Sequence, residues 1–177
     1  MLSLRPTMLS DLDYVLTCET DAANLPFITP WERTQHEGAV RFPDFRHFIV
    51  EAGGNTSDTA SRDGFVILQG CRNPHKSVEL KRLVLQKKGQ GLGRACVRQL
   101  KRLAFRDLHA HRFWLDVKSL NTRALALYAS EGFVEEGRLR ESVRIFGGHA
   151  DGYDTLVVMG LLDREYQARV ALGLEAT

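Results

Sequence analysis

The sequence is poor in cysteine. Its 177 residues include three cysteines, Cys18, Cys71 and Cys96, an odd number without a C-x-x-C spacing or a neighbouring histidine pair. Disulfide frameworks use even sets of cysteines, and structural zinc sites need four ligands at short, regular spacings. We therefore predict free thiols and no metal site.

Long hydrophobic runs are also missing. The longest uninterrupted apolar stretches, such as Leu156–Met159, span only a handful of residues, whereas a membrane-spanning helix needs about 20. The first residues, Met1–Pro6, lack the basic start and apolar centre of a signal peptide. These absences predict a cytoplasmic protein without a membrane partner.

Neither positive nor negative charge dominates the chain, which has 24 Lys+Arg and 22 Asp+Glu and a formal net charge of +2. The basic residues are nevertheless unevenly placed. Nine of them, and no acidic residue, lie between Lys81 and Arg106. Such a local positive field suits an anionic ligand held at one place, whereas nucleic-acid binding needs a broader basic face. We expect no nucleic-acid partner, and a solvated helix face is the alternative explanation of the cluster.

The chain has neither internal repeats nor low-complexity segments, so we predict a single domain over residues 1–177, with a motif-bearing core at about residues 64–162. Alternating or continuous apolar patterns predict strands, and apolar residues three or four apart predict helices. The expected strands are 3–5, 45–52, 65–71, 78–85, 113–118, 133–146 and 153–162, and the expected helices are 10–23, 34–41, 91–108, 121–131 and 163–172. This order predicts a mixed sheet in an α/β (α+β) fold.

A glycine-rich loop, Lys87–Arg94, follows one of these strands and opens a helix. Free N–H groups at a helix start bind phosphate, and glycine lets a ligand approach the backbone. The loop lacks the Gly-Lys-Ser/Thr ending of a P-loop, since Arg94–Ala95 follows its last glycine. A dinucleotide-binding fingerprint is broken too, because Arg94 or Cys96 replaces its third glycine, although Asp116 could imitate its ribose-binding acid. A turn with incidental lysines is the remaining alternative.

Two motifs follow one another along the chain. The first has Lys88, Gly91 and Gly93 at the fixed places of the pattern Q/R-x-x-G-x-G/A, and Lys88 departs from the usual Gln or Arg but keeps a donor. The second and more specific motif consists of Asn121, Ala124, Tyr128, Gly132 and Phe133. Together they resemble the GNAT superfamily of acetyl-CoA-dependent N-acetyltransferases, over most of the chain. The resemblance implies one domain with a mixed, mostly antiparallel central sheet of about six or seven strands flanked by helices.

The resemblance also implies acetyl-CoA as the cosubstrate. The amides and cations of the loop would bind its pyrophosphate. The backbone of Leu83–Leu85 would pair with the pantetheine arm and direct an N–H at the thioester carbonyl. The implied coenzyme-binding residues are Leu83, Val84, Leu85, Lys88, Gly89, Gln90, Gly91, Leu92, Gly93, Arg94 and Asn121.

Tyr128 is the implied general acid. It lies seven residues after Asn121, so both side chains fall on the same side of a helix, two turns apart. A phenol with a pKa of about 10 can protonate a leaving thiolate whose thiol has a pKa of about 8.5. Packing in an amphipathic core is the alternative role of Tyr128, and Asn121 can also cap the helix.

The acceptor amine must lose a proton before it attacks, because a lysine-like amine has a reference pKa of about 10.4. Glu79, on the strand before the loop, is the first candidate for the base, at a place where some family members carry a catalytic glutamate. Asp116 is the second candidate, and a water relay is the third route. Glu79 could instead form a surface ion pair with Lys81 or Arg82.

The predicted function is transfer of an acetyl group from acetyl-CoA to a primary amine, by direct attack in a ternary complex. By resemblance, the segments Phe27–Glu32 and Arg138–Gly152 shape the acceptor site, and they do not separate a small-molecule amine from an amino acid or a protein N-terminus. A non-catalytic acyl-CoA sensor that docks to a partner protein and an NAD(P)-binding oxidoreductase are the alternatives. The oligomeric state stays open, with a homodimer as one option.

Overall fold

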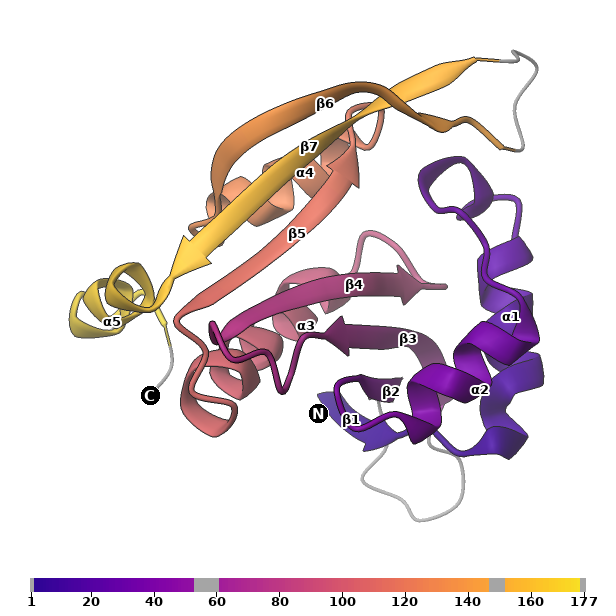
Figure 1. Cartoon of the computed structure of the whole chain (residues 1–177), viewed down its shortest axis with the longest axis horizontal. Helices are drawn as coiled ribbons and strands as arrows, with labels where there is room; N and C mark the ends of the chain where they lie inside the picture. Colours follow the sequence, from indigo (N-terminus) through magenta and orange to yellow (C-terminus); the bar gives the residue numbers. More distant parts are fainter. Residues whose placement is uncertain (1, 53–60, 147–151, 176–177) are drawn as a thin grey trace.

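The computed structural model describes residues 2–52, 61–146 and 152–175, and these residues form one seven-stranded sheet (Figure 1). The strands are β1 (Leu2–Pro6), β2 (Arg46–Ala52), β3 (Ser61–Gln69), β4 (Ser77–Leu85), β5 (Arg112–Lys118), β6 (Val134–Arg144) and β7 (Tyr153–Leu162). They lie in the order β1-β2-β3-β4-β5-β7-β6, and every neighbouring pair is antiparallel except β4 and β5, which are parallel. The predicted mixed, mostly antiparallel sheet is confirmed.

Five α-helices flank the sheet in the described residues: α1 (Leu12–Thr20), α2 (Arg33–Arg41), α3 (Leu92–Arg102), α4 (Thr122–Ser130) and α5 (Asp163–Ala171). Two single-turn helices, η1 (Leu9–Asp11) and η2 (Leu25–Phe27), stand before and after α1. A π-helical turn, η3 (Leu103–Asp107), extends α3. The helix predicted over residues 91–108 is thus divided into α3 and η3. None of the helices described is long and apolar enough to cross a membrane.

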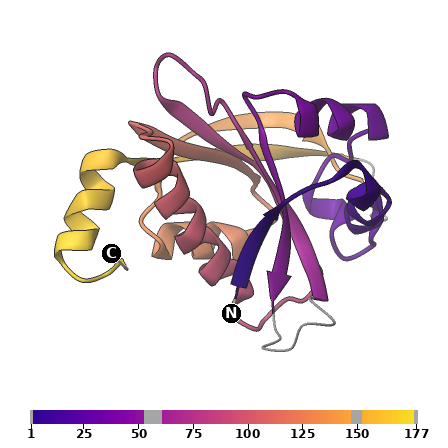
Figure 2. The ribbon, with the colours of Figure 1, turned by 90° about the horizontal axis from the view of Figure 1, so that it is seen from below.

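Both faces of the central strands are buried, because neighbouring residues of a strand point to opposite sides of the sheet. Ile49 of β2 and Phe65 of β3 belong to a buried cluster with α1. The next residue of each strand, Val50 and Val66, belongs to a second cluster with α3, α4 and β7. Helices α1 and α2 therefore cover one face and α3 and α4 the other, as Figure 2 shows.

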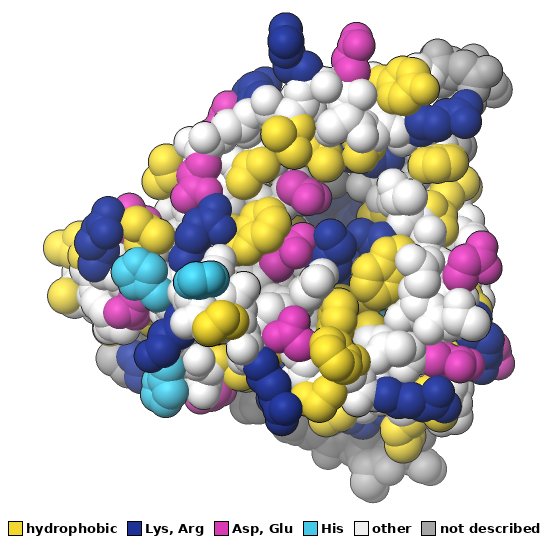
Figure 3. Space-filling model, in the orientation of Figure 1, with side chains coloured by type: hydrophobic (Ala, Val, Ile, Leu, Met, Phe, Trp, Pro, Cys, Tyr) yellow, Lys and Arg dark blue, Asp and Glu magenta, His cyan; other side chains and the backbone are white. Residues whose placement is uncertain are grey.

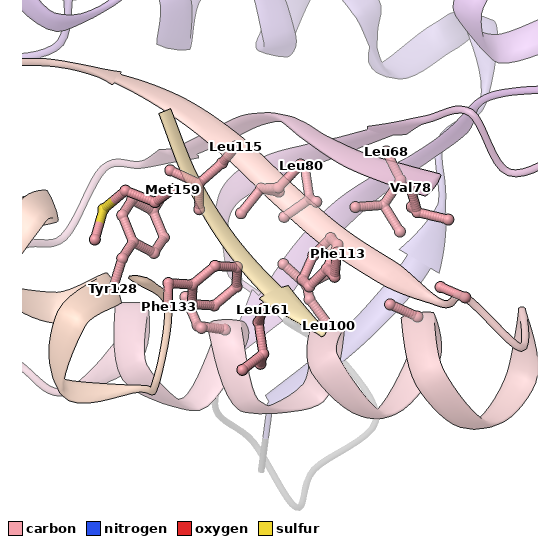
Figure 4. Close-up of a cluster of buried hydrophobic side chains, with 14 of the residues drawn as sticks. Leu68, Val78, Leu80, Leu100, Phe113, Leu115, Tyr128, Phe133, Met159 and Leu161 are labelled. Atoms are coloured by element: carbon pink, nitrogen blue, oxygen red, sulfur yellow. The ribbon is translucent and has the colours of Figure 1, made fainter. Parts of the chain in front are cut away.

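Helix α3 is held against the sheet by an apolar stripe. Cys96 and Leu100, one turn apart, are fully buried, and the basic residues of the helix lie around this stripe. Figure 4 shows Leu100 with Phe113 between the sheet and the helix, and Tyr128 and Met159 at one end of the same cluster. This packing fixes the start of α3 next to α4.

Strands β4 and β5 separate after a short parallel ladder. Only Ser77–Glu79 of β4 pair with Arg112–Trp114 of β5, although β4 continues to Leu85 and β5 to Lys118. The two strands visibly diverge beyond this ladder (Figure 1). The divergence opens the sheet at its centre.

A bulge in β4 accompanies the divergence. In the ladder with β3, Arg82 lies opposite Ile67 and Leu80 opposite Leu68, which leaves Lys81 without a counterpart. A bulge residue bends its strand and increases the local twist. Lys81 therefore marks the point at which β4 turns away from β5.

Candidate active site

A cavity of about 900 Å³ occupies the opening between β4 and β5. Figure 3 shows the hollow on this face, with lysine and arginine side chains at its base. One part, which we call the loop half, is lined by Leu83–Leu85, Lys87–Gly89, Gly91, Gly93, Arg94, Asn121, Arg123 and Tyr128. The other part, which we call the aromatic half, is lined by Phe27, Ile28, Thr29, Trp31, Lys81, Arg82, Asp116, Lys118, Val143 and Leu156.

The glycines of the loop half have conformations that other residues rarely adopt. Gly89 and Gly91 have φ angles of +88° and +76°, and Gly91 is the N-cap of α3. A Cβ atom on Gly93 would lie 3.3 Å from Leu127 Cδ2, so glycine lets α3 and α4 approach closely. The first helical amide that bonds back to Gly91 is that of Ala95. The amides of residues 92–94 consequently have no partner within the helix and can bind an anion.

Nine of the eleven predicted coenzyme-binding residues line the cavity: Leu83, Val84, Leu85, Lys88, Gly89, Gly91, Gly93, Arg94 and Asn121. Gln90 and Leu92 do not. They line a smaller pocket of about 410 Å³ on the other side of the loop, together with Leu2 and Asp63. Their side chains are thus placed away from the cavity, and Leu92 could contribute only its backbone amide.

The edge of β4 that faces the cavity is unpaired. From Leu80 to Leu85 the strand pairs with β3 on one side, and in the described chain no strand pairs with its other side. Backbone N–H and C=O groups along such an edge are ready to bond an extended ligand. The predicted backbone site at Leu83–Leu85 therefore has the required free edge.

The two predicted cations of the loop are engaged by the protein itself. Lys88 donates a hydrogen bond to the carbonyl of Ala23 across the cavity, with its ammonium 5.8 Å from the centre of the Phe27 ring. Burial lowers the pKa of Lys88. The guanidinium of Arg94 forms an ion pair of 2.6 Å with Glu131. Arg123, which sequence reasoning missed, lines the same half and comes within 4.0 Å of where a Cβ on Gly89 would lie.

A buried carboxylate neutralises part of the basic stripe of α3. Glu131 is fully buried and accepts hydrogen bonds from Arg94, Arg98 and Lys101. Burial alone would raise the pKa of Glu131, but the bonds from Lys101, Arg98 and Arg94 outweigh it and hold this pKa low. Lys101 also bonds Glu175. The basic cluster seen in the sequence is thus partly a structural ion network rather than a site for a ligand.

Tyr128 and Asn121 lie on the cavity side of α4. The Asn121 side chain accepts the N–H of Ala124 at 3.2 Å, so it caps the helix. Tyr128 lines the cavity while 92% of its surface is buried, with its ring against Phe133 at a centroid distance of 5.7 Å. Burial, and to a smaller extent Cys96, raises the pKa of the Tyr128 phenol. The phenol therefore keeps its proton until a base forms beside it, and the raised pKa also makes it a weaker acid than a free tyrosine.

The two candidate bases occupy different places. Glu79 is buried and accepts a hydrogen bond from Lys81 Nζ at 3.0 Å, and it is not among the residues that line the cavity. Asp116, on β5, is exposed and lines the aromatic half. The ion pair that was the alternative interpretation of Glu79 is therefore present, and Asp116 is the carboxylate nearer to the cavity.

Lys118 fastens three segments around the aromatic half. Its buried ammonium donates to the carbonyls of Pro26 at 3.1 Å, Ile28 at 3.4 Å and Arg144 at 3.3 Å. Burial lowers the pKa of Lys118. The segment from η2 to Ile28 and the end of β6 are thereby held against β5. Of the two predicted acceptor segments, Phe27, Ile28, Trp31 and Val143 line the cavity, whereas Glu32 does not, and residues 147–151 lie outside the described chain.

A row of buried polar side chains holds Arg82 on the side away from the cavity. Glu19 accepts from Arg82 Nε at 3.1 Å and from the Trp31 amide at 2.6 Å, and it lies 3.2 Å from His36 Nε2. His36 Nδ1 is 3.2 Å from His47 Nε2 in turn. Burial would raise the pKa of Glu19, but His36, the Trp31 amide and Arg82 together lower it. For His47, burial and the neighbouring His36 lower the pKa to about 3.

The described residues contain no group of three or more His, Cys, Asp or Glu side chains that could hold a metal ion.

The sequence model of a family described as acetyltransferase (GNAT) domain matches residues 1–134. Spermidine N(1)-acetyltransferase of Vibrio cholerae serotype O1 is 33% identical over 107 residues, which are 60% of this chain and 59% of that one. The enzyme of the same name from Escherichia coli K12 is 24% identical over 93% of this chain and 88% of its own.

Solved structures show the same architecture. Spermidine N-acetyltransferase from Vibrio cholerae in complex with CoA and spermine aligns with a TM-score of 0.79 and 25% identity, over 94% of this chain and 98% of that one. A dodecameric structure of the same enzyme aligns with a TM-score of 0.76 and 25% identity, over 95% and 97% of the two chains. The cavity described above therefore lies in a fold that holds coenzyme A in a solved relative.

Proposed function

The chain belongs to the acetyltransferase (GNAT) family, and from this premise we propose how its cavity transfers an acetyl group from acetyl-CoA to a primary amine. The observation that carries the proposal is the meeting of three features in one cavity. Free amides open α3, the edge of β4 is unpaired, and Tyr128 lies on the facing side of α4. The acceptor amine attacks the thioester directly, in a ternary complex.

We assign coenzyme binding, oxyanion stabilisation and proton donation each to a group of this chain. The amides at the start of α3, with Arg123, hold the pyrophosphate, and the edge at Leu83–Leu85 aligns the pantetheine arm. An N–H of this edge stabilises the oxyanion that forms when the amine nitrogen bonds to the acetyl carbon. When the C–S bond breaks, the electron pair leaves with sulfur, and Tyr128 gives its proton to the thiolate.

For the acceptor's proton we propose Asp116 as the direct base. Its carboxylate lines the aromatic half, and we propose that the ammonium of the acceptor lies there before attack. Glu79 is held by Lys81 at 3.0 Å, so it could take this proton only through a water relay or through Lys81. This arrangement supports Asp116 over our first sequence-based candidate.

We infer the assembly of this chain from a relative and its location from its cysteines. The dodecamer of the Vibrio cholerae enzyme supports self-association of this chain, for which a homodimer is the minimal form. Its three cysteines are free, as expected for a protein of the reducing cytoplasm. We propose a cytoplasmic homo-oligomer.

The test is consumption of acetyl-CoA with a panel of amines that includes spermidine, free amino acids and a peptide N-terminus, alongside calorimetric binding of CoA. Turnover with at least one amine is expected. If CoA binds and no amine is acetylated, the acyl-CoA sensor becomes the better explanation. If NADH binds and CoA does not, the oxidoreductase alternative replaces both.

A further inference from the structure

Most of the charged side chains that line the cavity are basic, although four of them form ion pairs with carboxylates behind the wall. In the described residues, seven basic side chains and one acidic side chain line it: Lys81, Arg82, Lys87, Lys88, Arg94, Lys118 and Arg123 against Asp116. Four of the basic residues belong to the loop half, where the diphosphate would bind, and three of these four already bond groups of the protein. The other three lie in the aromatic half, where the acceptor must bind.

The cations of the aromatic half keep hydrogen-bonding capacity for a ligand. Arg82 donates to Glu19, to the Lys81 carbonyl and to the Thr29 carbonyl. A guanidinium has five N–H groups, so two remain. Lys81 has one bonded partner, Glu79, and its side chain is 30% exposed. An ammonium has three N–H groups, so two remain there as well.

Lys118 adds a charge that no carboxylate pairs with in the described chain. Its ammonium is bonded to three main-chain carbonyls and is buried at the cavity wall. Charges inside such a wall are weakly screened and act at longer range than surface charges. A second ammonium group of a ligand in this half would therefore meet a repulsive field from Lys118, whereas the charge of Arg82 is offset by Glu19 at 3.1 Å.

The remaining wall is apolar. Phe27, Ile28 and Trp31 lie on one side, and Val143 and Leu156 lie on the other. The guanidinium of Arg82 stacks over the Trp31 ring at 5.1 Å from its centre, so the cationic and aromatic surfaces adjoin. This half offers one carboxylate for one ammonium, apolar contacts for a body, and unused donors for an anion.

We propose that the acceptor is a monoamine with an apolar body and an anionic group such as a carboxylate, and that polyamines are poor acceptors of this enzyme. This inference rests on the proposed acetyltransferase function. Asp116 receives the ammonium, and Lys81 and Arg82 receive the anion. The preferred acceptor thus differs from the one in the names of the spermidine acetyltransferases that resemble the chain.

The experiment uses three acceptors of equal length that differ only at the far end: 6-aminohexanoate, hexylamine and 1,6-diaminohexane, with spermidine as a fourth. We expect kcat/KM to be highest for the carboxylate and at least about tenfold lower for the diamine, because an unpaired or repelled charge in such a site costs that much. Spermidine should react as poorly as the diamine. A diamine or spermidine that exceeds the carboxylate overturns the inference.

A substitution locates the preference. Lys81→Gln removes a charge but can still donate to Glu79, and it should lower the carboxylate-to-diamine ratio about fivefold. Arg72→Gln removes the same charge from an exposed residue outside the cavity and should leave the ratio unchanged. If both variants keep the wild-type ratio, Lys81 does not bind the anionic group of the acceptor, and its assignment to that group is wrong. Absence of turnover of the wild-type protein with every amine would instead contradict the acetyltransferase proposal itself.

Discussion

The two halves of the cavity are built from pieces of chain that differ greatly in span. The loop half comes from β4, the loop that follows it, the start of α3, and α4 with its N-cap, all between residues 83 and 128. The aromatic half gathers residues from η2, β4, β5, β6 and β7, and Lys118 bonds carbonyls that are 92 and 90 residues away. One half is therefore set by local sequence and the other by tertiary packing. The halves should respond differently to substitution.

The largest effect is expected from the loop half. Tyr128→Phe should lower kcat about 100- to 1000-fold, because it removes the proton donor to the thiolate and keeps the packed ring. Steady-state kinetics and CoA calorimetry on the same preparation measure both properties. CoA affinity should stay within about twofold, since the hydroxyl is assigned no part in holding the pyrophosphate. A variant with nearly full kcat would give Tyr128 a purely structural role.

The second effect compares two carboxylates. Asp116→Asn should lower kcat/KM about 100-fold, which is the usual contribution of a general base. Glu79→Gln, the matched control, removes the same charge outside the cavity and should lower it less than about fivefold. The reverse ranking would restore Glu79 as the base and place proton removal on β4.

The third effect concerns the row of buried polar side chains behind the aromatic half. The pKa of His47 is lowered to about 3 in the folded state from a usual value of 6.5, so the unfolded chain binds more protons between these values. The stability that comes from the neutral His47 is therefore fully present above about pH 6.5 and is lost as the pH falls toward 3. Chemical denaturation at pH 7 and pH 5 should show wild type losing about 1–2 kcal/mol more than His47→Gln. Equal losses would remove His47 from this dependence.

The smallest effect returns to the loop. Gly91→Ala places a Cβ at φ +76°, which costs about 1–2 kcal/mol, and the free loop should relax to relieve this strain. CoA must then restore the strained conformation, so it should bind about tenfold more weakly. Gly38→Ala in α2 is the control, because its added Cβ meets nothing within 4 Å and its φ is ordinary for a helix. Calorimetry should find unchanged CoA affinity for the control. Equal affinity of both variants would show that the loop conformation is unimportant.

These contrasts explain what could be predicted from the sequence. The strand, the glycines and the helix of the loop half are consecutive, and the Asn121–Tyr128 spacing alone places both residues on one side of α4. Nine predicted residues accordingly line the cavity. The ion pair of Arg94 could not be predicted in this way, because its partner Glu131 lies 37 residues away and no local pattern indicates the pair.

The aromatic half could not be predicted in the same way. The bulge at Lys81 exists only in the register with β3, and that register is set by the packing of two faces at once. Lys118 did carry a signal, since it is a cation at the end of a strand whose residues 113–117 are apolar except for Asp116. The sequence cannot say that its acceptors are the carbonyls of Pro26, Ile28 and Arg144, because main-chain groups leave no trace in residue identity.

The three-residue ladder between β4 and β5 has a mechanical consequence for the whole molecule. Few backbone bonds join the β1–β4 side to the β5–β7 side, yet one apolar cluster contains Val66 from the first, Val157 from the second and Leu100 from the helix beneath both. Cooperative folding of the two sides must therefore depend mainly on the packing of these side chains. Such a joint can widen or narrow by small repacking without breaking a single strand, which suits a protein that has to admit a long, flexible cosubstrate and release it again.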